Sequence, residues 1–249
     1  MSGAPLEIAA DLPRAALRAA FAEHGRLHVA EVLTEASAQR IHRTLVAQNT
    51  WNLVTRQHGR HLDMDYTAVE AWSRADRDRL AETVRAGARD GFQYLYANVP
   101  IYDVWHGRLL PGHFFETLFE FLNGEPFLSL VRDITGADDI AFADGQATRY
   151  GPGHFLTRHD DDVAGKARRV AYVLNLTPEW QADWGGILQF IGADGHLDAG
   201  YVPAWNALNL FRVPQPHAVS LVAPFARGHR YAITGWLRAG VDPGPRRRA

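Results

Sequence analysis

The pattern of hydrophobic and polar positions along this 249-residue chain changes near its middle. Up to about residue 135, apolar residues recur every three or four positions, as on one face of a helix. Residues 34–48 show this most clearly, because a threonine of the kind that caps helices precedes a stripe made of Ala38, Ile41, Leu45 and Val46. We predict further helices over residues 13–23, 73–89, 113–122 and 126–135.

Beyond residue 140 the apolar residues form short β-prone runs with turn-forming residues between them. These runs predict strands at 140–150, 155–159, 169–177, 186–191, 207–213, 217–222 and 229–238. Short strands that follow one another without helices are typical of an antiparallel sandwich or barrel. We therefore predict one domain, residues 1–249, in which a helix-rich part (1–135) supports a β-rich core (140–238) and covers one face of it.

The composition narrows the classes of partner. The formal net charge is −2, so no global basic field attracts nucleic acid. No apolar run approaches the ~20 residues of a membrane span. The absence of cysteine fits a reducing compartment. We expect a cytoplasmic protein that binds neither nucleic acid nor membrane.

The stretch RHDDDV, residues 158–163, carries the first candidate chemistry. Alternate side chains of a strand share a face, so His159 and Asp161 are expected on one side and Asp160 on the other. A histidine and a carboxylate on one face supply two ligands of a 2-His-1-carboxylate iron site. We expect Asp160 and Asp162 to face solvent or to pair with basic neighbours.

The spacing His-x-Asp is a weak signal by itself, because it also occurs at His61 and His196 and chance predicts about one match. His196 lies in a glycine-flanked stretch that is typical of a hairpin loop. His61 lies in a polar, aperiodic stretch that indicates a surface loop, with a second metal or a substrate contact as the alternative. His159 follows an apolar strand start, and it is the copy best placed inside a rigid sheet.

Two residues further along could complete such a site. His217 begins an alternating run after prolines that favour an extended chain, with a purely structural histidine as the alternative. Arg230 lies in a β-prone, mostly apolar run, where burying a guanidinium is costly unless it is paired. A dicarboxylate would suit Arg230, because arginine forms bidentate bonds to carboxylates. The alternatives are an internal ion pair or an outward position on an edge strand.

The order of these residues resembles the Fe(II)/2-oxoglutarate-dependent dioxygenases, and within them the prolyl 4-hydroxylase-like branch. That branch includes the hypoxia-factor prolyl hydroxylases and the fungal ribosomal-protein prolyl hydroxylases. The matching order is Tyr150, His159-x-Asp161, Gly185-Gly186, His217 and Arg230-x-x-x-Thr234-x-Trp236. The resemblance covers about residues 140–238. It implies a mainly β fold with flanking helices, in which a double-stranded β-helix (jelly-roll) core is covered by the N-terminal helices.

By position, the resemblance implies that His159, Asp161 and His217 bind iron. It also implies that Arg230 binds the distal carboxylate of 2-oxoglutarate, with no catalytic residue beyond the metal ligands.

Other family positions are matched less firmly. Tyr150 and Thr234 would help to bind the co-substrate, although Tyr150 could equally be a core aromatic residue. Asn175 and Trp236 are candidates for the substrate pocket, with strand-end hydrogen bonding and packing as their alternatives. The hypoxia-factor enzymes have a second co-substrate tyrosine where this chain has Val173, which leaves the hydroxyl partners of the co-substrate open.

The implied function is the hydroxylation of a prolyl residue in a protein or peptide, with succinate and CO₂ as co-products. Fe(II), 2-oxoglutarate and O₂ would be required, and ascorbate is a candidate reductant. Residues 51–66 are a candidate flap over an open substrate groove, with an ordinary connection as the alternative.

Three other functions compete with this one. One is the same chemistry on a free amino acid or another small molecule. Another is a non-catalytic jelly-roll binding or sensor module, against which the full set of matched ligands argues. The third is a zinc hydrolase, which no nearby glutamate or nucleophile supports. The sequence does not indicate an oligomeric state.

Overall fold

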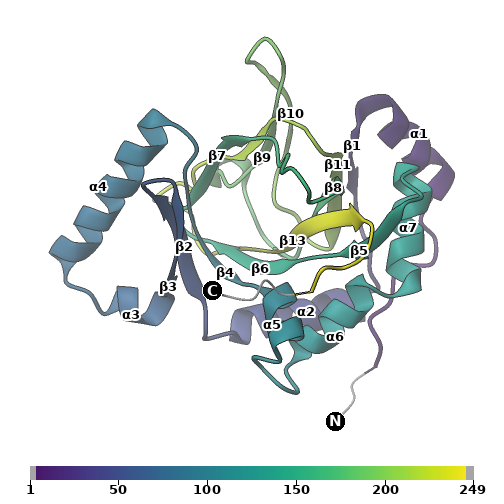
Figure 1. The fold of residues 1–249 in the computed structure, drawn as a ribbon, viewed down its shortest axis with the longest axis horizontal. Helices are drawn as coiled ribbons and strands as arrows, with labels where there is room; N and C mark the ends of the chain where they lie inside the picture. Colours follow the sequence, from purple (N-terminus) through teal and green to yellow (C-terminus); the bar gives the residue numbers. More distant parts are fainter. Residues whose placement is uncertain (1–3, 245–249) are drawn as a thin grey trace.

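One continuous β-sheet carries the architecture (Figure 1). The structure is a computed structural model that describes residues 4–244. Its strands are β1 (Arg26–Val29), β2 (Asn52–Gln57), β3 (Arg60–Asp65), β4 (Tyr94–Val99), β5 (Ile140–Ala143), β6 (Gln146–Tyr150), β7 (Phe155–His159), β8 (Arg168–Asn175), β9 (Leu188–Ile191), β10 (Leu197–Tyr201), β11 (Ala207–Arg212), β12 (His217–Val219) and β13 (Arg230–Ala239). Its helices are α1 (Arg14–His24), α2 (Glu35–Ala47), α3 (Tyr66–Glu70), α4 (Arg74–Asp90), α5 (Ile101–Gly107), α6 (Phe114–Leu122) and α7 (Glu125–Thr135), with a 3₁₀ turn at Ala182–Trp184.

The sheet turns back on itself to form a nearly closed barrel. Its strand order is β1-β11-β8-β13-β6-β4-β7-β12-β9-β10, with β2 and β3 extending from β4, and β5 pairing with β13. The pairings between named strands are antiparallel, and β4 reaches both layers because it pairs with β6 and also with β7. Figure 1 shows the two layers facing each other across the interior. The predicted jelly-roll class with flanking helices is confirmed.

Strand β8 lies at the centre and is buried on both faces. Val170, Tyr172 and Leu174 pack into the cluster under the helices, whereas Ala171 and Val173 face the barrel interior. This alternation follows from the two-residue period of a strand. It also explains why the sequence of β8 is an almost unbroken apolar run, since neither face meets water.

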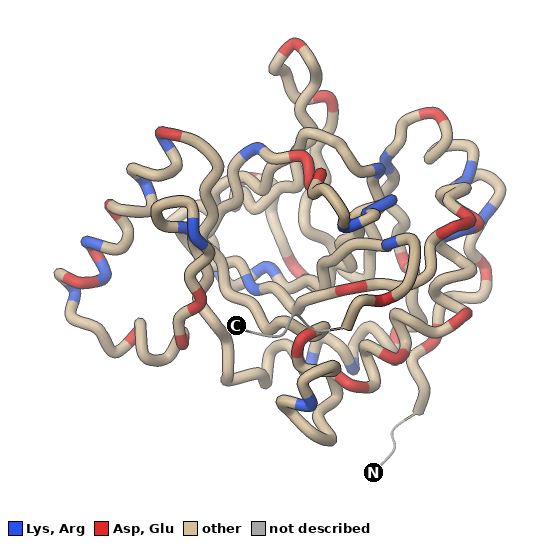
Figure 2. Tube along the Cα trace, viewed as in Figure 1, with Lys and Arg blue, Asp and Glu red and all other residues tan. Residues whose placement is uncertain are grey.

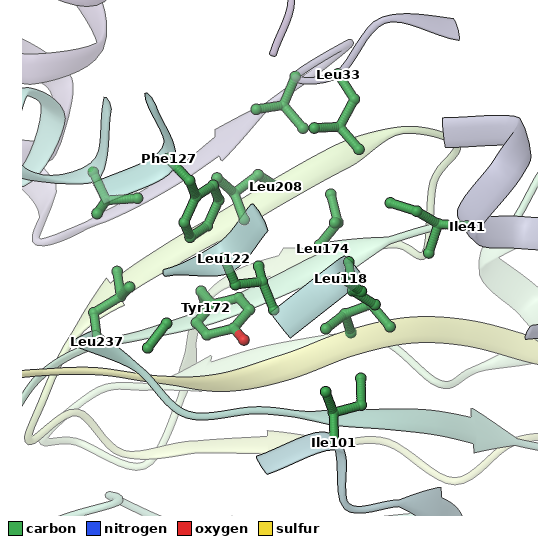
Figure 3. Close-up of a cluster of buried hydrophobic side chains, with 14 of the residues drawn as sticks. Leu33, Ile41, Ile101, Leu118, Leu122, Phe127, Tyr172, Leu174, Leu208 and Leu237 are labelled. Atoms are coloured by element: carbon green, nitrogen blue, oxygen red, sulfur yellow. The ribbon is translucent and has the colours of Figure 1, made fainter. Parts of the chain in front are cut away.

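Helices α1, α2, α5, α6 and α7 cover one face of the sheet, as predicted for the N-terminal helices. Figure 3 shows side chains of the helices and of the sheet in contact, among them Ile41, Ile101, Leu118, Leu122, Phe127, Tyr172, Leu174 and Leu208. Each of these side chains is almost completely buried. Burying a large apolar side chain contributes roughly 1.5–3 kcal/mol, so this cluster is a principal source of fold stability.

Helix α4 differs from the others because it is polar almost all round. Val84 is its buried residue, and basic and acidic side chains alternate along it (Figure 2). Three ion pairs at helical spacing, Arg74–Asp78, Arg79–Asp76 and Arg85–Glu82, lie on its surface. Such pairs support a helix that buries little apolar area.

The sequence pattern missed several elements in the first part of the chain. The α-helices all lie within residues 1–135 among the described residues, but this part also supplies β1 to β4. Strand β2 buries Leu53, Val54 and Thr55 in succession and therefore lacks the alternation that identifies a half-buried strand. Helix α5 and strand β10 were not predicted either, and the single strand expected at 140–150 is divided into β5 and β6.

Strands from both parts of the chain share the sheet. The assignment of residues 1–249 to one domain stays a prediction. No helix within residues 4–244 is long and apolar enough to cross a membrane.

The turn at Gly185-Gly186 gives a stability test. Gly185 has φ +69° and ψ −146°, a conformation that is essentially restricted to glycine, and a Cβ there would lie 2.0 Å from the Leu221 carbonyl oxygen. Gly185→Ala should lower the free energy of unfolding by about 3 kcal/mol. Gly195→Ala is the control, because Gly195 also has a positive φ (+85°) but its Cβ would meet nothing within 4 Å. That variant should lose only about 1 kcal/mol. Denaturant titration measures both, and equal losses would contradict the proposed clash.

Candidate functional site

The barrel interior contains a cavity of about 420 Å³. Apolar side chains, among them Leu156, Leu188, Phe211 and Val219, form part of its wall. The polar side chains that also line it include a group of two histidines and a carboxylate, and the Arg230 side chain. These are the residues on which the sequence prediction depends.

His159, Asp161 and His217 come together in this cavity. β12 pairs with β7 so that His217 lies directly opposite His159, and their ring centroids are 4.0 Å apart. The Asp161 carboxylate lies 3.4 Å from His159 Nε2 through one oxygen and 3.5 Å from His217 Nε2 through the other. One candidate ligand atom from each residue falls within 4.8 Å of the others, a spacing that can hold a metal ion.

Both imidazole rings are fixed by the backbone. His159 Nδ1 lies 3.0 Å from the Thr157 carbonyl oxygen, and His217 Nδ1 lies 2.7 Å from the Gln215 carbonyl oxygen. A carbonyl can only accept, so each Nδ1 carries a hydrogen and each Nε2 is the ring nitrogen that faces the carboxylate. This is the tautomer and orientation that a metal-binding histidine requires.

His159 and Asp161 come together, but not because they share a strand face, so that part of the prediction is wrong. β7 ends at His159, and Asp161 has φ +65°, a left-handed conformation that aspartate tolerates better than most residues. The chain therefore turns at Asp161 and brings the carboxylate back over His159. Asp160 and Asp162 are exposed as expected, and the Asp160 carboxylate accepts the Asp162 backbone N–H at 3.0 Å.

Arg168, which sequence reasoning passed over, contacts this turn. Its Nη1 donates a hydrogen bond to the Asp161 backbone carbonyl at 2.9 Å. Its guanidinium lies 3.4 Å from the centroid of the Trp236 ring, a cation–π contact. Arg168 thus links the left-handed turn to β13.

The protonation states suit a divalent cation. Burial by itself would raise the pKa of the Asp161 carboxyl, but hydrogen bonding and the electrostatic interaction with His159 lower it below its ordinary value. Burial, and then the neighbouring His159, lowers the pKa of His217 to about 4. Near neutral pH the group therefore offers a carboxylate and a neutral His217 imidazole, which is the state that metal binding requires.

Arg230 is a buried cation for which residues 4–244 provide no carboxylate partner. Only 2% of its surface is exposed, and among the described residues nothing accepts a hydrogen bond from its Nε or Nη1. The guanidinium lies 5.2 Å from the centroid of the Tyr150 ring and lines the cavity. The alternatives of an internal ion pair and an outward position on an edge strand are therefore excluded, because β13 has neighbours on both sides. A buried unpaired guanidinium is costly, so the site fits an anionic ligand.

Tyr150 and Thr234 line the same cavity as Arg230. Tyr150 is buried, and burial raises the pKa of its hydroxyl. The nearby Arg230 charge partly offsets this rise. Val173 also lines the cavity, on the wall formed by β8, and offers no hydroxyl.

Of the two candidates for the substrate pocket, one lines the cavity and the other does not. Trp236 lines the cavity, and its indole lies near enough to help lower the pKa of Asp161. Asn175 does not line it. Its amide nitrogen instead donates to the carbonyls of Val173 and Ala207, both at 3.3 Å, at the end of β8. The strand-end alternative therefore describes Asn175, and its assignment to the substrate pocket was wrong.

The other two His-x-Asp copies lie elsewhere. His196 is exposed in the turn between β9 and β10, as expected of a hairpin loop. His61 is not in a loop. It lies on β3 in a regular hairpin with β2, and its Nδ1 is 2.7 Å from the Tyr94 hydroxyl.

The hairpin formed by β2 and β3 replaces the irregular segment expected at residues 51–66. It is attached to the barrel by the antiparallel pairing of β2 with β4. None of its residues is among those that line the cavity, so the structure does not place it as a flap over this site.

Sequence reasoning also missed Tyr96 on β4 and Gln146 on β6, which both line the cavity. Tyr96 lies far upstream of the matched motif, in a strand that the pattern did not predict. Gln146 lies inside the matched region, but it belongs to no spacing that indicates a ligand.

Comparison with known proteins points to one class of enzyme. Residues 145–238 match the family model of the 2OG-Fe(II) oxygenase superfamily. The resemblance to Fe(II)/2-oxoglutarate dioxygenases is thereby confirmed.

The particular relatives are prolyl hydroxylases. The chain is 33% identical over 120 residues to the prolyl 3-hydroxylase OGFOD1 of Mus musculus, which is 45% of this chain but only 22% of that protein. A prolyl-4-hydroxylase from Pseudomonas putida has the same fold, with a TM-score of 0.55 and 23% identity over 92% of this chain and 100% of its own. A prolyl hydroxylase from Trichoplax adhaerens, solved with a peptide of the hypoxia inducible factor oxygen degradation domain, gives a TM-score of 0.56 and 14% identity over 91% of this chain and 89% of its own.

The unpaired Arg230 leads to a prediction for the ligand-free protein. Arg230→Met replaces a buried cation that has no partner with an apolar side chain of similar length. The variant should be at least as stable as the wild type, by up to about 1 kcal/mol, because no ion pair is broken.

Arg238→Met is the matched control on the same strand. Arg238 is also buried, but its Nη1 lies 3.5 Å from the Asp144 carboxylate and its Nε donates to the Lys166 carbonyl at 2.7 Å. Breaking this buried pair should cost about 3 kcal/mol. Urea unfolding without added anions measures both variants. A loss for Arg230→Met as large as that for Arg238→Met would show that the Arg230 guanidinium is already paired.

Proposed function

We propose that this chain is an Fe(II)- and 2-oxoglutarate-dependent dioxygenase that hydroxylates a prolyl residue in a protein or peptide. The observation that carries the proposal is the presence of two complementary features in one cavity. A His-Asp-His group suited to a divalent cation lies there, and so does a buried arginine that lacks an anionic partner.

His159, Asp161 and His217 would hold the iron. Two neutral imidazoles and one carboxylate form the ligand set of non-haem Fe(II) oxygenases. The single negative charge of Asp161 offsets part of the cation's charge, and the backbone hydrogen bonds to both Nδ1 atoms fix the ring orientations. Iron together with 2-oxoglutarate supplies the oxidation of an unactivated C–H bond by O₂.

Arg230 would bind the distal carboxylate of 2-oxoglutarate. Its free Nε and Nη1 are donors for a carboxylate, and the apolar walls strengthen the attraction by excluding water. Tyr150 and Thr234 would assist Arg230 with their hydroxyl groups. The chain's own part in the reaction is therefore to position its ligands and to shield them from solvent.

A polypeptide substrate is supported by the rim of the cavity and by the relatives. Phe92 and Val163 line the cavity, yet they are 39% and 45% exposed, so they present an apolar surface that a bound polypeptide could cover. Trp236, which also lines the cavity, would contact the substrate. Because the chain spans about a fifth of the length of the curated relatives it matches, their full activity does not transfer automatically. We further propose a cytoplasmic location, in line with the absence of cysteine, and ascorbate as an external reductant, to which we assign no residue.

The assignment of Asp161 as an iron ligand can be tested with an isosteric pair of variants. Asp161→Asn removes the charge that faces the two histidines and should reduce O₂-dependent succinate formation by about 100-fold or more. Asp160→Asn is the control. It changes an exposed neighbour and keeps an oxygen that can accept the Asp162 N–H, so activity should stay within about twofold. The assay reconstitutes the protein with Fe(II) and 2-oxoglutarate without O₂, then admits O₂ and measures succinate. Equal loss in both variants would refute the assignment, and absence of iron binding by the wild type would refute the function.

The substrate class needs a separate experiment. With the reconstituted wild type, a peptide library containing proline should raise succinate formation and gain one oxygen atom on proline, as seen by mass spectrometry. The matched library with alanine in place of proline should do neither. Stimulation by free proline or another free amino acid, with none by the peptides, would instead favour the small-molecule alternative.

A further inference from the structure

Tyr96 is a cavity residue to which the family resemblance gives no role. It lies on β4, in the N-terminal part of the chain, and its ring stacks on that of Tyr150 with a centroid separation of 5.0 Å and an interplanar angle of 7°. Tyr150 in turn contacts the Arg230 guanidinium. The Tyr96 phenol therefore lies beside the part of the cavity that is suited to an anion.

A short chain of amide hydrogen bonds leads to this phenol. Asn98 Nδ2 donates to Gln146 Oε1 at 2.7 Å, and Gln146 Nε2 donates to the Tyr96 hydroxyl oxygen at 3.3 Å. Each bond orients the next group. Because Asn98 uses the Gln146 carbonyl as an acceptor, the Gln146 amide nitrogen is the group that faces Tyr96.

The direction of these hydrogen bonds determines whether the phenol is free to donate one of its own. A hydroxyl that accepts from Gln146 still has its own hydrogen to donate. Among residues 4–244 no acceptor receives it, while the phenol borders the cavity. Reversing both amides would place the Asn98 N–H₂ group where its carbonyl oxygen now lies, a buried position without any partner, so the reversed direction leaves two donors unsatisfied.

The phenol also remains a donor over the physiological pH range. Burial is the main reason that the pKa of Tyr96 rises to about 12. The negative charge of Asp161 contributes to this rise. Tyr96 lines the same cavity as both features that the proposed function links.

We propose that Tyr96 is a co-substrate-binding residue whose phenol donates a hydrogen bond to the dicarboxylate held between Arg230 and the His-Asp-His group. Asn98 and Gln146 are positioning residues that fix the direction of this bond. This inference rests on the proposed function. It assigns a hydroxyl donor to a cavity in which Val173 occupies the place of the second co-substrate tyrosine of the hypoxia-factor enzymes. That donor comes from β4, in the N-terminal part of the chain.

The test is the affinity for 2-oxoglutarate rather than turnover. Tyr96→Phe keeps the ring stacked on Tyr150 and removes only the hydroxyl. In the Mn(II)-loaded protein without O₂, calorimetry should show that the dissociation constant for 2-oxoglutarate rises about tenfold or more, as expected when a hydrogen bond to a charged acceptor is lost. Tyr102→Phe is the control, because it removes a hydroxyl that is bonded to Asp242 and lies outside the residues lining the cavity. It should leave the constant unchanged.

A double-mutant cycle tests the orienting role of the amides. Gln146→Met removes the donor that fixes the phenol, so the penalty of Tyr96→Phe should shrink at least threefold in that background, because coupled residues are not additive. If Tyr96 acted only by packing, the two effects would multiply independently.

The outcomes separate this inference from the proposed function. If the wild type binds 2-oxoglutarate and Arg230→Met does not, the proposed co-substrate site stands whatever Tyr96 does. An unchanged constant for Tyr96→Phe would then overturn the role of Tyr96 alone. A raised KM for the peptide with an unchanged dissociation constant for 2-oxoglutarate would overturn that role too, because the hydroxyl would then bind the substrate. If the wild type does not bind 2-oxoglutarate, both proposals fall.

Discussion

The register of β12 is the constraint on which the site depends. β12 is only three residues long, yet it is hydrogen-bonded to β7 on one side and β9 on the other, which places His217 opposite His159 and Phe190. A slip of one residue would turn His217 out of the barrel and Ala218 into it, because strand side chains alternate. Two neighbours hold the register where one would leave it weakly determined. The turn at Asp161, tied by Arg168, then needs to bring only one more oxygen to a pair of rings that is already in place.

The charges of the cavity are arranged for a ligand with two different ends. Asp161 provides a negative charge beside the histidines, and Arg230 provides a positive charge beside Tyr150. Apolar side chains of β7, β9 and β11 line the same cavity and keep the dielectric low. A neutral ligand would leave Arg230 unpaired, whereas an anion linked to a cation at the histidines satisfies both ends. Direct contact between Asp161 and Arg230 would have cancelled the two charges, and no such ion pair forms among the described residues.

The sequence predicted the chemistry of the site better than its geometry. The chain order of His159, Asp161, His217 and Arg230 resembles that of the Fe(II)/2-oxoglutarate-dependent dioxygenases, and it was this resemblance that predicted their convergence. The strand-face argument for Asp161 failed because a left-handed residue at the end of β7 leaves no mark in the pattern. Strands β2 and β4 were missed because their burial follows neither period clearly, and Tyr96 was missed with them. Asn175 was misassigned because its amide is needed by backbone carbonyls that only the folded strand brings near.

The unpaired guanidinium of Arg230 also couples folding to the contents of the cavity. The empty chain carries the desolvation cost of that cation, and a bound anion removes it. A ligand that binds only the folded state stabilises it in proportion to the logarithm of its concentration above the dissociation constant. For this protein the ligand would offset the desolvation of the Arg230 guanidinium as well as adding contacts. The resistance of the chain to unfolding and proteolysis would thus follow the supply of a small metabolite, so that the amount of intact protein reports the metabolic state as well as its own synthesis.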